Sequence, residues 1–404
     1  MKNAVMYGAG NIGRGFIGML LSQSGYRVIF VDVAQPVIEA LNSEGTYPVR
    51  IISSAGYQDI PVENVCAVNG NDSALVAKTI ADADIMATAV GVNVLKFIIP
   101  NIVAGIRLRM QQQGGPLNII ICENLMDANK VMEGMLKAQL TEAEQAWFDE
   151  NIGLVEASIG RMVPVQTEEM KDGNPMRVCV ESYGFLPVDQ AAFKGEIPQI
   201  QNMVPYVPFD FYLKRKLYIH NMGHATCAYL GDLLGLPYIY EAIDVSEIYI
   251  IVKNAMEESA LALSKKYGVP LRDILAHIQD LLQRFTNEAL QDTCQRVGGD
   301  PTRKLSPRDR LIGSASLALE MGVTPVHIAI GAAAGVHRYL KEAGTEQSRE
   351  AAEAVLSEVS GLNPGSKLCQ LILGMYVMLL AGADLKALQK AAAAITAREN
   401  PNVI

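Results

Sequence analysis

A chain of 404 residues is too long for one small core, and its length favours two domains of roughly 150–200 residues each. Half of the residues are hydrophobic and 19% are charged, as in a folded globular protein. The net charge of −9 gives the chain no general attraction for nucleic acid or anionic lipid, so we expect neither as a partner. No feature of the sequence indicates an obligate protein partner.

The N-terminal residues run directly into a strand pattern, without the basic and apolar segments of a secretion signal. The most apolar stretches, 90–103 and 372–381, are interrupted by polar residues, Pro or Gly before they reach the ~20 apolar residues that span a bilayer. The six cysteines are scattered without a CxxC pair, which is typical of buried thiols in a reducing compartment. We therefore predict a cytoplasmic protein without zinc.

The first 160 residues alternate short β-branched runs with helical patterns. Strands are predicted at residues 4–7, 27–32, 85–90, 117–122 and 153–158, and helices between them at 12–24, 92–112 and 125–140. This alternation predicts an α/β domain in which helices flank a parallel sheet. Segments 49–52 and 58–64, separated by a turn, indicate a small antiparallel excursion from it.

From about residue 209 the pattern changes to helical spacing, interrupted by turns that contain glycine and proline. Stretches such as 248–267 and 348–360 have apolar residues three and four apart, which marks helices packed on one face. The stretch 165–205, rich in Pro, Gly and Met, is predicted as a bridge. We expect a first domain over residues 1–205, including this bridge, and a mostly α-helical second domain over 206–404.

A GxGxxG turn follows the first predicted strand and precedes the first predicted helix; it comprises Gly8, Ala9, Gly10, Asn11, Ile12 and Gly13. Gly8 permits the tight turn, Gly10 lets the backbone approach a pyrophosphate, and Gly13 lets helix and strand pack closely. The N-terminus of the helix adds N–H donors and a positive partial charge. Strand, turn, helix and second strand in this order predict a Rossmann-type dinucleotide-binding domain.

The second predicted strand ends at Asp32, 19 residues after Gly13, where a carboxylate would bind the hydroxyls of the adenosine ribose. No arginine follows it to accept a 2′-phosphate, so we expect NAD as the cofactor and not NADP. Two alternatives stay open. The glycines could serve packing alone in a domain without nucleotide, or a flavin could replace the nicotinamide.

Later strand ends are expected to face the cofactor, because ligands bind at the carboxyl edge of such sheets. Thr88, Val90 and Gly91 end one strand with small residues that would let the nicotinamide ribose approach. Asn124 follows another strand and would place an amide near the reacting ring.

One helical stretch of the second half contains three residues whose side chains can exchange protons or form hydrogen bonds with a substrate: Lys216, Asn221 and His224. At the α-helical period, His224 lies about 80° and Asn221 about 140° around the helix from Lys216, so all three can border one cleft. Oxidising an alcohol needs a base for the hydroxyl proton and donors for the developing alkoxide. On spacing alone, a solvated lysine with an asparagine and histidine satisfied in the core is the favoured interpretation. His220 and His224 are four residues apart but lack a third ligand, so we expect no metal.

The spacing K-x4-N-x2-H resembles the signature of the polyol-specific long-chain dehydrogenases, the mannitol dehydrogenase family. Further matching strings are GAGNIGRGFI at 8–17, TAVG at 88–91, CEN at 122–124, AYLG at 228–231, AMEES at 255–259 and RKLS at 303–306. The likeness is collinear over nearly the whole chain.

The resemblance implies an NAD-dependent oxidoreductase that uses no metal. It implies Lys216 as the general base, Asn124 and Asn221 as the pair that holds the substrate oxygen, and His224 as a contact to a substrate hydroxyl. Within the family the likeness implies a phosphorylated substrate, with reversible hydride transfer between mannitol 1-phosphate plus NAD⁺ and fructose 6-phosphate plus NADH. A sister oxidoreductase for unphosphorylated mannitol or a hexuronate, and an NAD(H)-sensing protein without turnover, are the alternatives.

A run of four cations in residues 303–310 offers candidate phosphate donors in an otherwise acidic chain. A solvated loop in which Asp309 pairs locally is the equally weighted alternative. The resemblance favours phosphate binding by Arg303 or Lys304, and a sugar phosphate or polyol is therefore the expected small-molecule partner.

Overall fold

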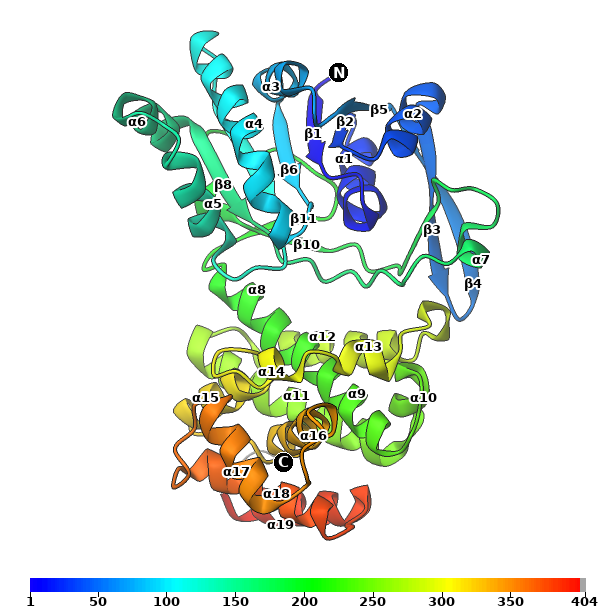
Figure 1. Ribbon diagram of the computed structural model, residues 1–404, viewed down its shortest axis with the longest axis vertical. Helices are drawn as coiled ribbons and strands as arrows, with labels where there is room; N and C mark the ends of the chain where they lie inside the picture. The colour runs from blue at the N-terminus through cyan, green and yellow to red at the C-terminus, as the bar shows by residue number, and fades with distance from the viewer. Residues whose placement is uncertain (400–404) are drawn as a thin grey trace. The chain divides into compact units, whose positions relative to one another are not determined.

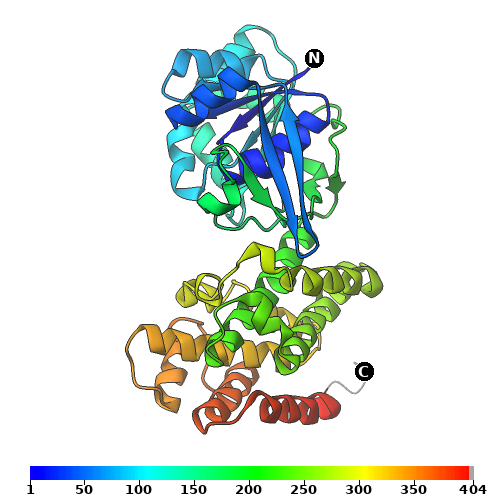
Figure 2. The same cartoon turned by 90° about the vertical axis from the view of Figure 1, so that its right-hand side faces the viewer.

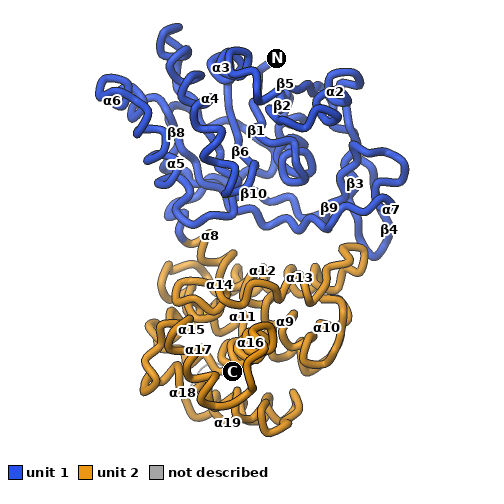
Figure 3. Tube along the Cα trace, viewed as in Figure 1, with its two compact units in different colours: residues 1–210 blue, residues 211–404 orange. Residues whose placement is uncertain are grey.

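The computed structural model describes residues 1–399. The chain forms two compact units, the first spanning Met1–Asp210 and the second beginning at Phe211 (Figure 3). The division lies a few residues after the predicted boundary between residues 205 and 206.

The centre of the first unit is a six-stranded parallel sheet with the strand order β5-β2-β1-β6-β7-β8. Its strands are β1 (Asn3–Tyr7), β2 (Arg27–Asp32), β5 (Val65–Asn69), β6 (Ile85–Thr88), β7 (Leu117–Ile121) and β8 (Ile152–Glu156). The order runs outward from β1 in both directions, so the chain reverses direction across the sheet between β1 and β6, as in a Rossmann-type domain. The predicted α/β class is confirmed, and β5 is the one strand of this sheet that the sequence pattern did not indicate.

Helices cover both faces of this sheet (Figure 1). They are η1 (Gly13–Gly18), a π-helix that continues into α1 (Met19–Gln23), and then α2 (Gln35–Glu44), α3 (Ser73–Ala81), α4 (Val92–Gln111), α5 (Ala128–Lys137) and α6 (Glu142–Asn151). Because successive side chains of a strand point to opposite faces, β1 contributes Ala4 and Met6 to one hydrophobic core and Val5 and Tyr7 to the other. The first core contains residues of η1, α1 and α2, and the second contains residues of α3, α4, α5 and α6.

The predicted antiparallel excursion is present as β3 (Thr46–Ser53) paired with β4 (Gly56–Glu63), a long hairpin that is blue in Figure 2. The stretch predicted as a bridge is no free linker, because it contributes strands to the first unit. Its β9 (Val178–Val180) pairs in parallel with β3, and its β10 (Leu186–Asp189) pairs with β11 (Met203–Tyr206). Two short helices, α7 (Glu168–Lys171) and η2 (Gln190–Ala192), complete it. Buried Val178, Val180, Leu186 and Val188 join the core of the first unit, which a composition-based prediction could not reveal.

The second unit is mostly helical, as predicted. Its helices are α8 (Asp210–Arg215), η3 (Lys216–Asn221), α9 (Met222–Leu233), α10 (Ile239–Asp244), α11 (Ser246–Tyr267), α12 (Leu271–Phe285), η4 (Glu288–Leu290), α13 (Cys294–Gly298), α14 (Pro301–Lys304), α15 (Ile312–Glu320), α16 (Val326–Glu342), α17 (Arg349–Glu358), α18 (Lys367–Leu380) and α19 (Leu385–Glu399). The helix α16 packs against α9, α11 and α18 (Figure 1). Its segment GAAAG, residues 331–335, permits close approach, and a side chain at Gly331 would collide with Thr226 of α9. None of the described helices has the length and apolar character needed to cross a membrane.

Candidate active site

In the glycine turn between β1 and η1, two of the glycines are required because a side chain there would collide with neighbouring backbone atoms. Gly8 has a φ of +103°, and a Cβ there would lie 2.5 Å from the carbonyl oxygen of Ala89. A Cβ at Gly13 would collide with the carbonyl oxygen of Gly8. Gly10 differs from both, because it is exposed and a Cβ there would meet no atom within 4 Å. Packing therefore explains Gly8 and Gly13 but leaves Gly10 unexplained, whereas a bound pyrophosphate would need the space above it.

Asp32 lies at the carboxyl end of β2, directly beside this turn. Its Oδ2 accepts the N–H of Ala9 at 2.6 Å, and its Oδ1 accepts the N–H groups of Val33 and Ala34 at 2.7 and 2.9 Å. The carboxylate thus ties the end of the second strand to the glycine turn. The Asp32 side chain is only half-buried, so its remaining lone pairs can accept ribose hydroxyls.

The carboxyl end of β6 carries the other predicted cofactor neighbours. Thr88 is fully buried, whereas Val90 is half-buried and Gly91 is exposed, with a φ of +90°. Glu123, which the sequence analysis missed, accepts the N–H groups of Val90 at 3.0 Å and Gly91 at 2.8 Å. The Glu123 side chain is buried, and the next residue, Asn124, is exposed. Glu123 therefore holds the turn after β6, and its place directly before Asn124 was the available signal.

The second unit places Lys216 and Asn221 at the two ends of one wide helical turn. The segment η3 is a π-helix that begins at Lys216 and ends at Asn221, between the α-helices α8 and α9. In a π-helix the hydrogen bonds join residues i and i+5, so these two residues lie one turn apart. The angle of about 140° predicted with the α-helical period is therefore wrong, because the helix widens at this segment. Such wide turns occur frequently at functional sites.

His224 lies one turn further along, in α9. Its ring stacks on Phe285 of α12, with centroids 4.9 Å apart and an interplanar angle of 17°. Its Nε2 lies 3.1 Å from Oδ2 of Asp292, a residue that the sequence analysis did not select. His220 is buried, and burial together with the nearby cation of Arg284 lowers the pKa of its imidazole well below the usual value. Within residues 1–399, no group of three or more His, Cys, Asp or Glu side chains is arranged to hold a metal ion.

Arg303 and Lys304 end the short helix α14, and both have partners within the protein. Arg303 is exposed and pairs with Asp300 at 2.7 Å and with Asp309 at 3.3 Å. Lys304 is buried and donates to the carbonyl oxygen of Gly299. Burial and the neighbouring cations lower the pKa of Lys304 to about 8. The local pairing of Asp309 is thus present, and phosphate binding by either cation stays a prediction.

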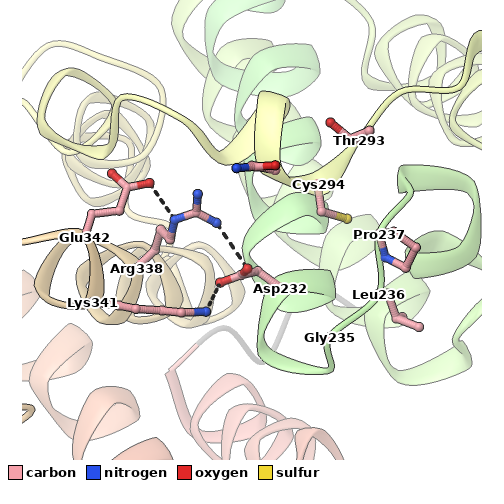
Figure 4. Close-up of a pocket in the computed structure, with 10 residues that line it drawn as sticks. Asp232, Gly235, Leu236, Pro237, Thr293, Cys294, Arg338, Lys341 and Glu342 are labelled. Atoms are coloured by element: carbon pink, nitrogen blue, oxygen red, sulfur yellow. Dashed lines mark hydrogen bonds and ion pairs between the residues drawn. The ribbon is translucent and has the colours of Figure 1, made fainter.

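A cavity of about 550 Å³ in the second unit is lined by residues that include Thr293 and Cys294 (Figure 4). Its charged side chains pair with one another. Arg338 lies 3.1 Å from Asp232 and 2.6 Å from Glu342, and Lys341 lies 3.3 Å from Asp232 (Figure 4). None of the predicted catalytic residues lines this cavity.

A Rossmann-type unit with an open glycine turn, followed by a helical unit that carries a lysine, an asparagine and a histidine on consecutive turns, defines a nicotinamide-dependent oxidoreductase. Comparison with protein families specifies the class further. The model of the mannitol dehydrogenase Rossmann domain matches residues 2–202, and that of the mannitol dehydrogenase C-terminal domain matches residues 209–360. The chain therefore belongs to the mannitol dehydrogenase family of NAD-dependent polyol dehydrogenases.

Solved structures show the same fold. The mannitol 2-dehydrogenase of Pseudomonas fluorescens, solved as a ternary complex with NAD and D-mannitol, is 14% identical with a TM-score of 0.74, and the match covers 96% of this chain and 94% of that one. A D-sorbitol dehydrogenase in substrate-free form is 17% identical with a TM-score of 0.77, over 96% of this chain and 95% of that one. At this identity the likeness establishes the shared fold over the 96% of the chain that each match covers.

Proposed function

We propose that this protein interconverts mannitol 1-phosphate and fructose 6-phosphate by hydride transfer with NAD. The observation that carries the proposal is the wide turn η3, which presents Lys216 and Asn221 one turn apart with His224 in the next turn. Support for NAD comes from the unfilled space at Gly10 and from the Asp32 carboxylate beside it. The NAD bound in the mannitol 2-dehydrogenase of the same fold agrees with this cofactor.

Different residues of the chain have different roles in the proposed reaction. NAD, when bound, supplies the group that accepts or returns the hydride. In the oxidative direction Lys216 takes the proton of the substrate hydroxyl, since a lysine in a desolvated site can act as a general base. The Asn221 amide donates to the oxygen as negative charge grows on it, and Asn124 is the proposed second donor. His224 contacts a neighbouring hydroxyl and so orients the sugar.

One assay tests this proposal directly. Purified protein is mixed with NADH and, in parallel, with fructose 6-phosphate, fructose, tagaturonate or fructuronate, and the loss of NADH absorbance is followed. We expect the highest kcat/KM with fructose 6-phosphate, and much slower oxidation of NADPH because Asp32 repels a 2′-phosphate. Turnover of fructose or a hexuronate in preference to fructose 6-phosphate would contradict the proposed substrate.

Lys304→Ala provides a test of the phosphate contact. If Lys304 binds the phosphate, the substitution raises KM for fructose 6-phosphate far more than it lowers kcat, because a binding charge is lost and the reacting groups remain. Since the pKa of Lys304 is about 8, the wild-type KM should also rise as pH increases through that value, whereas the variant's KM should not. An unchanged KM in the variant would place the phosphate elsewhere.

The alternative is a sister enzyme for an unphosphorylated polyol or a hexuronate. The observation that favours it is that Arg303 and Lys304 already have partners, in Asp300, Asp309 and the Gly299 carbonyl. The same parallel assay separates it from the main proposal, since a sister enzyme would reduce fructose or a hexuronate and would be indifferent to Lys304→Ala.

The oxidation state of the cysteines is relevant to the cellular compartment in which the protein works. All six are thiols outside any disulfide in the described residues, and five of them are buried. Burial raises the pKa of the Cys294 thiol to about 12, which keeps it protonated and unreactive. We propose that the enzyme operates in the reducing cytoplasm.

A further inference from the structure

Asp292 lies in a segment whose backbone is fixed on both sides. The N–H of Ile239 donates to its carbonyl oxygen at 2.9 Å, and the N–H of Cys294 donates to the carbonyl oxygen of Pro237 at 2.8 Å. A β-bridge between Tyr238 and Thr293 closes this pairing. The position of Asp292 is therefore determined by the segment that leads into α10, independently of its side chain.

The Asp292 carboxylate divides its two oxygens between two partners. Its Oδ1 accepts the N–H groups of Arg296 Nε at 2.8 Å and Nη2 at 2.5 Å, which anchors that oxygen on the arginine. Its Oδ2 lies 3.1 Å from Nε2 of His224. Burial alone would raise the pKa of Asp292, but the bonds to His224 and Arg296 outweigh it and hold the pKa below its usual value. The group facing His224 is thus an ionised carboxylate, which is an acceptor only.

The His224 ring is constrained on a face and on one edge. Phe285 stacks on its face, and its Nε2 is shut off from solvent, with Oδ2 of Asp292 at ion-pair distance but not aligned as a hydrogen bond. A neutral imidazole has one protonated nitrogen, and the hydrogen bond of one nitrogen determines the state of the other. An acceptor at Nε2 favours the proton on that atom, so in the neutral ring Nδ1 is left as the unprotonated acceptor.

We propose that Asp292 is a positioning residue that holds His224 in its Nε2–H tautomer, so that Nδ1 accepts a hydrogen bond from a substrate hydroxyl. The inference rests on the proposed function, since it gives the role of the histidine contact in it. It also assigns a direction to that contact: the sugar hydroxyl donates and His224 accepts. The site then selects substrates that carry a hydroxyl next to the reacting carbon, because a substrate without one leaves Nδ1 unpaired.

The test joins spectroscopy with kinetics. The protein has five histidines, so a ¹⁵N spectrum of the imidazoles can be assigned to His224 by comparison with His224→Asn. We expect the Nε2–H pattern in the wild type and a mixed-tautomer pattern in Asp292→Ala. We expect kcat/KM for the sugar to fall about 10- to 100-fold in Asp292→Ala, as for other carboxylates that orient a histidine, with the Kd for NADH unchanged. In Asp292→Asn the amide oxygen should face the Arg296 donors and the NH2 group should face Nε2 of His224, so we expect the opposite, Nδ1–H tautomer and a loss of kcat/KM in this variant as well.

A matched control is Asp280→Ala, because Asp280 also pairs with an arginine, Arg284 at 3.4 Å, but is half-exposed and on the surface of α12. An unchanged His224 spectrum in Asp292→Ala, or a loss of kcat/KM no greater than in Asp280→Ala, would overturn the proposal. If Asp292→Ala does not fold, Asp292→Asn decides by the same spectrum. If the wild type reduces none of the sugars, the proposed function fails, and the tautomer of His224 alone then supports or overturns the role of Asp292.

Discussion

Replacing Lys216 with alanine is expected to lower kcat for sugar reduction by roughly 10²–10⁴-fold, the range for loss of a general acid–base group. Lys216 begins the π-helix η3 and is half-buried, and alanine is a good helix former, so the helix itself should persist. The Kd for NADH should not change, because Lys216 has no part in the cofactor turn. Steady-state kinetics with fructose 6-phosphate and fluorescence titration with NADH measure the two quantities separately.

Lys214→Ala is the matched control for this variant. Lys214 lies two residues earlier in the same helical stretch, and its Nζ lies 3.4 Å from the Tyr218 hydroxyl. The Lys214→Ala substitution removes one positive charge, as Lys216→Ala does, but leaves the proposed base in place, so kcat should stay within a few-fold of the wild type. Equal losses in the two variants would show that Lys216 acts only through charge or stability, and would contradict its role as the base.

The second large effect is expected at the glycine turn, where one substitution by alanine should lower stability and another should weaken NADH binding. Gly13→Ala places a Cβ against the carbonyl oxygen of Gly8, so it should lower the free energy of unfolding by about 1–3 kcal/mol, the usual cost of overpacking. Gly10→Ala meets no atom within 4 Å, so stability should be close to that of the wild type. Its methyl group would nevertheless occupy the space needed by a pyrophosphate, weakening NADH binding about 10- to 100-fold.

Denaturant unfolding and NADH titration of both variants check this pair of predictions. The contrast is informative because each glycine serves as the control for the other: same residue type, same turn, same added methyl group. A Gly10→Ala protein that is stable and still binds NADH as tightly as the wild type would mean that the turn serves packing alone. That result would remove the main structural support for the cofactor site.

The architecture could be predicted from the sequence because each pattern that indicates it involves residues close together in the chain. β-Branched runs alternating with helical spacing identify a parallel sheet, and the glycines with Asp32 identify a nucleotide-binding turn, all within one βαβ segment. The strand β5 escaped prediction because it begins two residues after β4 ends, so no helical pattern separates it from the antiparallel excursion. Strands β9, β10 and β11 escaped because a Pro- and Gly-rich composition resembles a linker until its contacts are known: β9 pairs with β3, and β10 is bridged to Ala157, just after β8.

The proposed catalytic residues also divide into those that local spacing indicates and those that only tertiary contacts reveal. Lys216, Asn221 and His224 could be selected from spacing, but their relation depended on an assumed α-helical period, and the helix widens where packing allows it. No pattern selects Asp292, and only its place before Asn124 points to Glu123, because the importance of both lies in what they contact: backbone N–H groups 32 and 33 residues away for Glu123, and the His224 ring for Asp292.

The sequence by itself therefore determined the fold class, the glycine turn, the acidic end of β2 and the three side chains of the second unit, since these depend on local preference and on the spacing of neighbours in the chain. Only the tertiary structure decided which of the glycines is free of packing, which carboxylate faces His224 and which cations already have partners. Those properties arise when distant segments meet and exclude water, and burial, charge pairing and hydrogen-bond direction do not exist before that contact is made.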